Sequence, residues 1–149
     1  MKVFYAHSAT SSREQTDQEV RMLKDFLTDR THQKVRVRAG RDDYKHNWKG
    51  DWDTWQYGVI NRMDMTTRKP VYDIFVVSGT HCGRATANIL SLALSVGRPV
   101  FWWSGSNPGN LYKVQTIEKE DPEDWTAGWR IVRDQPKQMP LPFEENPMP

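Results

Sequence analysis

Two short segments of the chain combine residue types that could bind or transform a small ligand. Residues 6–10 (AHSAT) end a short apolar run and continue it as a polar loop, and residues 78–84 (SGTHCGR) precede a helical pattern. Main-chain N–H groups at the start of a helix favour an anion such as a phosphate, and an arginine adds a bidentate charge. We therefore predict that the second segment binds a phosphate through Ser78, Gly79, Thr80, Gly83 and Arg84.

The same two segments carry further reactive side chains whose roles the sequence leaves open. His7 and His81 are candidates for ligand contact, and surface histidines in ordinary loops are the alternative. Together with Cys82 they suggest a metal, but the paired spacing typical of zinc ligands is missing, so we predict no metal. Cys82 close to a helix start could also act as a nucleophile, although no other motif of a Cys-His enzyme accompanies it.

An aromatic and highly charged segment occupies residues 40–57. Aromatic rings stack on nucleobases, and Trp48 is the best candidate because it precedes the helix that we predict here. We expect a loop to Gly50 and then a helix from Asp51 to about Met65. Its apolar stripe is expected to hold core residues, namely Trp52, Trp55, Val59 and Met63.

The hydrophobic pattern predicts the framework that positions these segments. Apolar or alternating runs at residues 2–6, 34–38, 72–77 and 100–103 are typical of strands. One helix is predicted to begin after Ser11 or Ser12, and another covers residues 85–96. The run from 72 to 103 is a strand-helix-strand unit, which makes its strands parallel. We predict an α/β, Rossmann-like (flavodoxin-like) three-layer domain with a mainly parallel sheet, which binds ligands at the carboxyl ends of its strands.

The remainder of the chain is predicted to close the sheet edge. Residues 111–117 and 129–132 indicate a C-terminal antiparallel hairpin, and residues 134–149 read as a proline-rich tail. The expected organisation is one domain over residues 1–133. The alternating strand with Arg36 and Arg38, followed by Arg41, is interpreted as a solvated edge rather than as a nucleic-acid surface.

Composition narrows the choice of partners and compartment. The 149 residues carry a net charge of +2, which argues against a DNA-coating protein, so we expect no nucleic-acid partner. No acidic residue lies between Asp73 and Glu118, so this window either has a positive local potential or is mostly buried.

No apolar run is long enough to span a membrane, and no signal-peptide pattern begins the chain. A single cysteine is typical of a reducing, cytoplasmic setting.

Residues 2–8 (KVFYAHS) and 72–103 (YDIFVVSGTHCGRATANILSLALSVGRPVFWW) carry a resemblance. Over residues 2–103 the chain resembles the nucleoside 2-deoxyribosyltransferase-like family, which includes deoxynucleoside 5′-monophosphate N-glycosidases and many phage-encoded relatives. The resemblance implies a nucleoside or nucleotide bound over the strand ends, near Tyr5, His7 and Ser8. It also implies a phage-encoded homo-oligomer that needs no cofactor.

The chain departs from this family at the position that matters most for catalysis. The family has a glutamate in the first turn of the helix after the third strand, and it acts at C1′ of the deoxyribose. Asn88 occupies that position here, and an amide is neither a good nucleophile nor a base. The resemblance implies an acid/base aspartate near the end of the preceding helix, and Asp64 is the nearest match.

Three interpretations therefore stay open. The chain is a hydrolase or transferase acting on an N-glycosidic bond through Asp64, or it is a catalytically degenerate member that binds a nucleotide as a sensor or sequestering protein. The third is an accessory protein that acts through protein contacts, with its Trp-rich segment and proline-rich tail as the interface.

Overall fold

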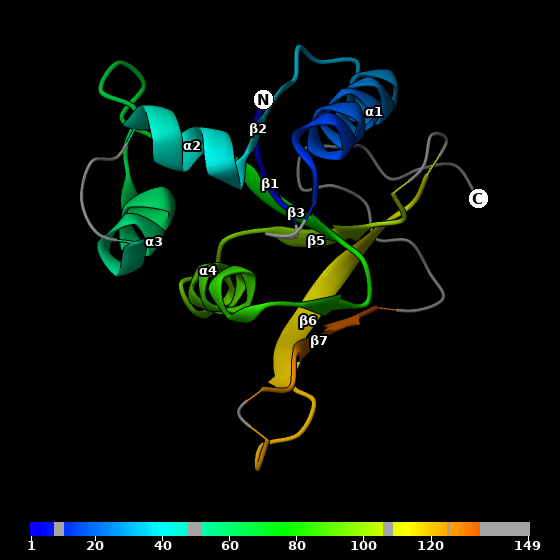
Figure 1. Ribbon diagram of the computed structural model, residues 1–149. Helices are drawn as coiled ribbons and strands as arrows, with labels where there is room; N and C mark the ends of the chain where they lie inside the picture. Colours follow the sequence, from blue (N-terminus) through cyan, green and yellow to red (C-terminus); the bar gives the residue numbers. More distant parts are fainter. Residues whose placement is uncertain (8–10, 48–51, 106–108, 125, 135–149) are drawn as a thin grey trace.

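The protein is a mixed α/β structure built on a mostly parallel sheet. The computed structural model in Figure 1 describes residues 1–7, 11–47, 52–105, 109–124 and 126–134, with only the main chain for 45–47, 52 and 53. Its seven strands follow the order β2-β1-β3-β5-β6-β7-β4. The four neighbours β2 (Arg36–Ala39), β1 (Lys2–Ala6), β3 (Ile74–Ser78) and β5 (Val100–Trp103) are all parallel.

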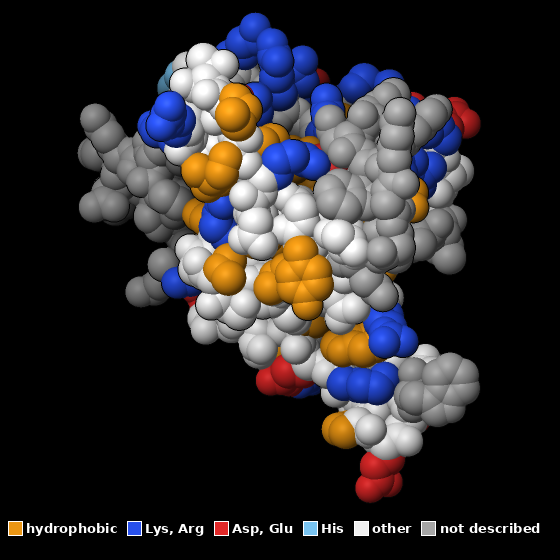
Figure 2. All heavy atoms as spheres, turned by 90° about the vertical axis from the view of Figure 1, so that its left-hand side faces the viewer, with side chains coloured by type: hydrophobic (Ala, Val, Ile, Leu, Met, Phe, Trp, Pro, Cys, Tyr) orange, Lys and Arg blue, Asp and Glu red, His pale blue; other side chains and the backbone are white. Residues whose placement is uncertain are grey.

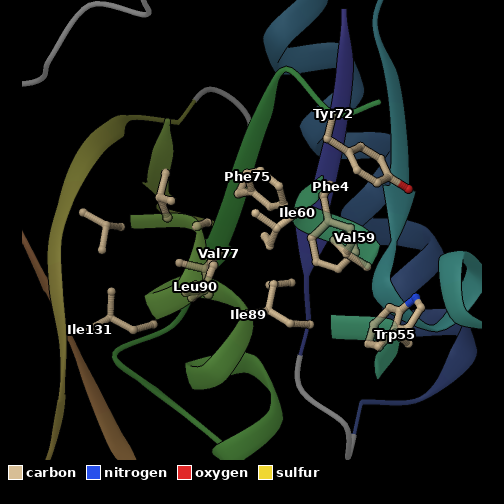
Figure 3. Close-up of a cluster of buried hydrophobic side chains, with 14 residues drawn as sticks. Phe4, Trp55, Val59, Ile60, Tyr72, Phe75, Val77, Ile89, Leu90 and Ile131 are labelled. Carbon is tan, nitrogen blue, oxygen red and sulfur yellow. The ribbon is translucent and has the colours of Figure 1, made fainter. Parts of the chain in front are cut away.

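Helices cover both faces of this parallel part. Helix α1 (Arg13–Thr31) buries Leu23, Phe26 and Leu27 against one face. Helices α3 (Trp52–Asn61) and α4 (Arg84–Ser95) lie on the other face, where their apolar side chains meet Phe4, Phe75 and Val77 (Figure 3). The near-continuous apolar runs of β1 and β3 are explained by this double coverage. Ser12, one of the two serines that the sequence offers as a cap, caps α1 by accepting a hydrogen bond from the main-chain N–H of Gln15.

The predicted C-terminal hairpin is confirmed. Strands β6 (Leu111–Lys119) and β7 (Trp129–Arg133) are antiparallel to each other, and β6 is antiparallel to β5. Val114 and Ile131 point into the core that contains α4, so the hairpin curls the sheet around that helix (Figure 1). The result is a sheet shaped like half of a barrel.

Strand β4 (His81–Cys82) is the element that completes this curl, and the sequence did not predict it. It follows β3 directly, yet it pairs with β7 at the far edge of the sheet. The segment after β3 was expected to be a plain turn into a helix. Two residues are too short to show a strand periodicity, and their pairing depends on a partner almost 50 positions later.

Two further expectations are corrected around the aromatic segment. The predicted loop over residues 40–50 contains helix α2 (Gly40–Asn47), whose first turn holds Asp42 and Asp43, where negative charge stabilises a helix. Helix α3 ends at Asn61 rather than near Met65, and Met63 is 46% exposed instead of buried. Trp55 and Val59 do lie in the core as predicted.

Candidate ligand site at the carboxyl ends of the parallel strands

Two adjoining pockets open where the parallel strands end. The first has a volume of about 600 Å³ and lies among the ends of β1 and β2 and helices α2, α3 and α4. The second, of about 250 Å³, lies between the ends of β1 and β3 and the start of α4. Ala6, His7 and Thr86 line both pockets, so the two form one continuous crevice.

Aromatic and aliphatic side chains form the walls of the first pocket. Phe4, Trp55 and Ile89 are almost wholly buried behind it, whereas Tyr44 is 37% exposed. The Tyr44 ring meets Trp55 edge to face, with centroids 5.3 Å apart. Tyr44 is therefore the aromatic wall residue most available for a planar ligand to stack on.

A buried carboxylate fixes this aromatic wall from behind. Asp43 is fully buried and accepts hydrogen bonds from Trp55 Nε1 at 2.8 Å, from the Tyr72 hydroxyl, and from Arg62 at 2.5 Å. Burial, reinforced by the hydrogen bond to Asp43, raises the pKa of Tyr72, so its phenol stays protonated as the donor. Because its oxygens are occupied by these donors, Asp43 holds the wall in place.

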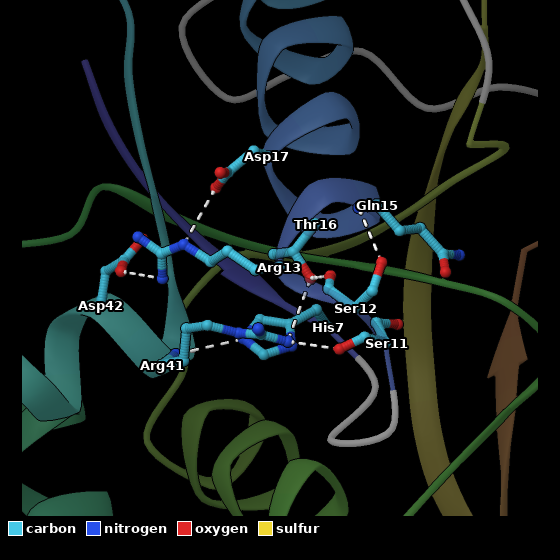
Figure 4. A network of polar contacts seen from close by, with 9 residues as sticks. All are labelled: His7, Ser11, Ser12, Arg13, Gln15, Thr16, Asp17, Arg41 and Asp42. Atoms are coloured by element: carbon cyan, nitrogen blue, oxygen red, sulfur yellow. Dashed lines mark hydrogen bonds and ion pairs between the residues drawn. The ribbon is translucent and has the colours of Figure 1, made fainter.

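A polar rim joins the ends of β1 and β2 at the mouth of the first pocket (Figure 4). The main-chain N–H of Arg41 donates to His7 Nε2 at 3.1 Å, which requires that nitrogen to be unprotonated. The Arg41 guanidinium donates to the Ser11 carbonyl at 2.7 Å and to Thr16 Oγ1 at 3.2 Å. Gly40 packs closely beside this rim, since a Cβ there would stand 3.2 Å from the ring of Phe4 and 3.8 Å from His7 Nε2.

The second pocket meets the amino terminus of α4. Gly83 caps that helix without a side-chain hydrogen bond, and no acidic residue lies in the first turn. Thr86, in that first turn, is within 3.5 Å of the His7 carbonyl oxygen through its hydroxyl. The helix dipole therefore gives this end of the crevice a partial positive charge.

A hydrogen-bonded chain of side chains supports the second pocket. Ser78 Oγ lies 2.7 Å from the Tyr5 hydroxyl, which also hydrogen-bonds Glu19. Burial and the Glu19 hydrogen bond raise the pKa of Tyr5, so the phenol stays protonated. Its hydroxyl donates a hydrogen bond to the Glu19 carboxylate. Ser78 consequently donates to Tyr5 and presents an oxygen that accepts hydrogen bonds.

Cys82 lines the second pocket but is poorly suited to act as a nucleophile. Burial raises the pKa of its thiol to about 11. The thiolate is the reactive form, and at neutral pH almost none is present. The position of Cys82 near a helix start therefore does not activate it.

The structure brings together only part of the predicted site. His7, Ser78, His81 and Gly83 line the crevice, and Tyr5 lies directly behind Ser78. Ser8 and Trp48 fall outside the described residues. The remaining members of the predicted phosphate site, and Asn88, do not line either pocket.

Those members have other surroundings. The Gly79 carbonyl accepts from Trp102 Nε1 of β5 at 2.7 Å, and the Thr80 carbonyl accepts from the Ile131 N–H of β7 at 3.0 Å. Arg84 and Asn88 are exposed on α4. His81, by contrast, lines the second pocket, and its Nε2 also lies 3.3 Å from Glu120 at the surface.

Asp64 lies at the opposite end of the strands, which separates it from the crevice. Its Oδ2 is 3.3 Å from the ammonium of Lys2, the first residue of β1. Its Oδ1 accepts from the N–H groups of Thr66 and Thr67 at 2.8 and 3.0 Å. These main-chain hydrogen bonds, followed by the Lys2 contact, lower the pKa of Asp64. The structure therefore gives Asp64 a role in a turn, at the amino ends of the strands.

Sequence reasoning missed Gly40, Arg41, Tyr44 and Thr86. The signal was available, because β2 is parallel to β1 and its carboxyl end must reach the same edge of the sheet. The residues directly after β2 are therefore as strong candidates for ligand contact as those after β1 and β3. The interpretation of residues 40–50 as an independent loop did not use their position after β2.

No carboxylate lines the crevice in the part of the chain that the structure describes. Its lining residues include no aspartate or glutamate. Among the described residues, no group of three or more His, Cys, Asp or Glu side chains is placed to bind a metal ion.

None of the described helices has the length and apolar character needed to cross a membrane.

Comparison of the chain with protein families, with curated proteins and with solved structures found no match.

Proposed function

We propose that the protein binds a nucleoside or nucleotide in the crevice at the carboxyl ends of β1, β2 and β3, without turning it over. The observation that carries this proposal is the pair of adjoining pockets, one with an aromatic wall and one at a helix start whose N-cap, Gly83, makes no side-chain hydrogen bond. Their volumes lie in the range of small-molecule sites. A nucleotide has the matching parts, a flat apolar base and an anionic phosphate.

The strand order supports the location of the site. The parallel strands run β2-β1-β3-β5, which is the order of the first four strands in a Rossmann-like domain of the flavodoxin type. In such sheets ligands bind where the strand order reverses, between the first and third strands. The second pocket lies at that point, between Ala6 and His7 on one side and Val77 and Ser78 on the other.

The two pockets suggest how the ligand lies. The base stacks against Tyr44 in the first pocket, where base–aromatic stacking stabilises by about 1–3 kcal/mol. The phosphate lies at the start of α4, against the main-chain N–H groups of its first turn. The sugar spans the shared residues, with the Thr86 hydroxyl within reach.

The chemistry of the lining favours binding over cleavage. Glycosidic bond cleavage of the kind implied by the family resemblance requires a carboxylate at C1′. The described lining residues supply hydroxyls, imidazole and guanidinium groups instead. Asp64, the expected acid/base residue, lies at the other end of the strands.

The test is a thermal-shift screen of nucleosides and nucleoside mono-, di- and triphosphates, with base release followed by chromatography in the same samples. A ligand at about 100 times its Kd stabilises by about 2.7 kcal/mol, or a rise in Tm of roughly 5–10 °C. We expect such a rise without free base. Orthophosphate alone is the control for simple anion binding. Failure of every nucleoside and nucleotide to raise the Tm would refute the proposal, and release of free base would refute binding without turnover.

A further inference from the structure

A strongly basic groove, separate from the crevice, is lined by residues of β1, α1 and β2. It has a volume of about 480 Å³, and none of its lining residues lines the crevice. Five cations line it and no carboxylate does, its full lining being Lys2, Val20, Arg21, Lys24, Arg36, Val37, Arg38, Val71 and Tyr72. Figure 2 shows Lys and Arg side chains gathered at the top of the molecule.

Most of these cations are available to a partner. Arg21, Lys24, Arg36 and Arg38 are exposed. Lys2 is the member with a carboxylate contact, at 3.3 Å from Asp64. The groove thus concentrates positive charge, although the whole chain has a net charge of only +2.

The groove follows the open edge of the sheet. Strand β2 is the terminal strand beside β1, and the Arg36 N–H donates to the Met1 carbonyl at 2.8 Å. Because successive residues of a strand direct their main-chain groups to alternate sides, the N–H and C=O of Val37 point away from β1. These are the groups that an added strand would pair with.

The cations flank that edge on both faces of the sheet. Arg21 and Lys24 come from α1, which covers one face, together with the side chain of Val37. Arg36 and Arg38 alternate with Val37 along β2, so they project from the other face. An extended chain paired with β2 would direct its side chains alternately toward these two groups.

We propose that the β2 edge is a docking site for an acidic peptide segment of a partner protein, which binds as an added strand. Main-chain pairing with Val37 supplies the geometry, and the four exposed cations select for Glu and Asp on both sides of the bound strand. The same charges oppose pairing of β2 with β2 of a second copy, because like charges would then face each other.

The surface fits an acidic peptide better than a nucleic acid. Single-stranded nucleic acids bind by stacking bases on aromatic side chains beside a basic track. Tyr72 is the aromatic residue in this lining, it is 3% exposed, and its hydroxyl is bonded to Asp43. Between the cations the groove presents Val20, Val37 and Val71, which suit the aliphatic part of a Glu side chain.

The experiment uses the full chain and a fluorescein-labelled oligo-glutamate of about eight residues, which self-repulsion keeps extended. Binding is measured by fluorescence anisotropy at low salt, where screening is weak. We expect saturable binding that the double variants Arg36→Gln/Arg38→Gln and Arg21→Gln/Lys24→Gln each weaken about tenfold. The matched control Lys113→Gln/Arg130→Gln removes the same charge on β6 and β7 and should leave the affinity unchanged.

Two further measurements separate strand addition from general attraction between charges. A peptide N-methylated at alternate amides keeps its charge but loses half of its main-chain donors, and we expect it to bind at least about fivefold more weakly. Hydrogen exchange of the Val37 amide should slow when the unmodified peptide is bound. Equal binding of the N-methylated peptide, or equal weakening by the control variant, would overturn the proposal. Tighter binding of an oligothymidylate of the same charge would instead identify a nucleic-acid surface.

Discussion

At the level of single residues, the ligand crevice depends on contacts between residues that are distant in the sequence. His7 follows β1 and Arg41 follows β2, and a hydrogen bond from a main-chain amide to an imidazole joins them. Protonation of His7 Nε2 would abolish that bond, because the nitrogen could no longer accept a hydrogen. The rim of the pocket is thus held by groups that no local sequence motif connects.

Tyr44 offers the most direct test at this scale. Replacing it with alanine, Tyr44→Ala, removes the exposed aromatic wall of the first pocket, and loss of a stacked base costs about 1–3 kcal/mol. We expect nucleotide affinity, measured by calorimetry, to fall about 5- to 150-fold. Tyr57→Ala is the matched control, since Tyr57 is 60% exposed and lies outside the lining. An unchanged affinity of Tyr44→Ala would remove the stacking role.

Asp64 provides the contrasting case. Because its folded pKa is lowered, the stabilisation that it contributes is complete above about pH 4 and is lost as the pH falls further. We expect Asp64→Asn to lower the Tm at pH 7, through loss of the charged contact with Lys2, and to have a smaller effect at pH 3. Nucleotide affinity should not change. A large loss of affinity with an unchanged Tm would place Asp64 in the site after all.

At the level of elements, the strands and helices with strong periodicity could be predicted, and the irregular connections could not. The apolar runs of β3 and β5 and the amphipathic pattern of α1 and α4 predict their elements well, because burial on one or both faces dictates the residue types. Helix α2 is short, polar and begins with glycine, which is typical of a loop. Strand β4 depends on its pairing with β7, a long-range contact that periodicity does not reveal.

The same reasoning explains the partial success at the site. His7 and Ser78 were found because they directly follow strands that the pattern predicts. Thr86 and Tyr44 lie on helices, where the side chain that faces a pocket depends on how the helix packs. Asp64 was misplaced because the end of α3 was predicted about four residues too late, although the chain leaves the helix at Asn61.

The hairpin is expected to stabilise the whole core. Ile131 of β7 is 6% exposed and lies in the same apolar cluster as Ile89, Leu90 and Val114. Truncation of a buried isoleucine costs about 2–5 kcal/mol, so Ile131→Ala should lower the free energy of unfolding in urea by that amount. Lys113→Ala, on the exposed side of β6, should change it by less than about 0.5 kcal/mol. Equal, small effects of both variants would show that the hairpin does not belong to the core.

At the level of the whole molecule, β2 separates two surfaces of different chemistry. Its carboxyl end leads through Gly40 and Arg41 into the ligand crevice, and its open edge carries the basic groove. A ligand bound in the crevice would contact the residues that follow β2, and a peptide bound in the basic groove would contact β2 itself. The proposed small-molecule site and the proposed peptide-docking edge therefore lie on adjacent parts of one sheet.

The central claim, that the crevice binds a nucleotide, is tested most directly by mapping amide chemical shifts in the ¹⁵N-labelled protein during a titration with a nucleoside monophosphate. The account predicts that the largest changes occur at His7, Arg41, Tyr44 and Thr86, which come from the end of β1 and from helices α2 and α4 but line one crevice. Changes confined to the basic groove or to the β6–β7 hairpin, or no change at millimolar ligand, would contradict it.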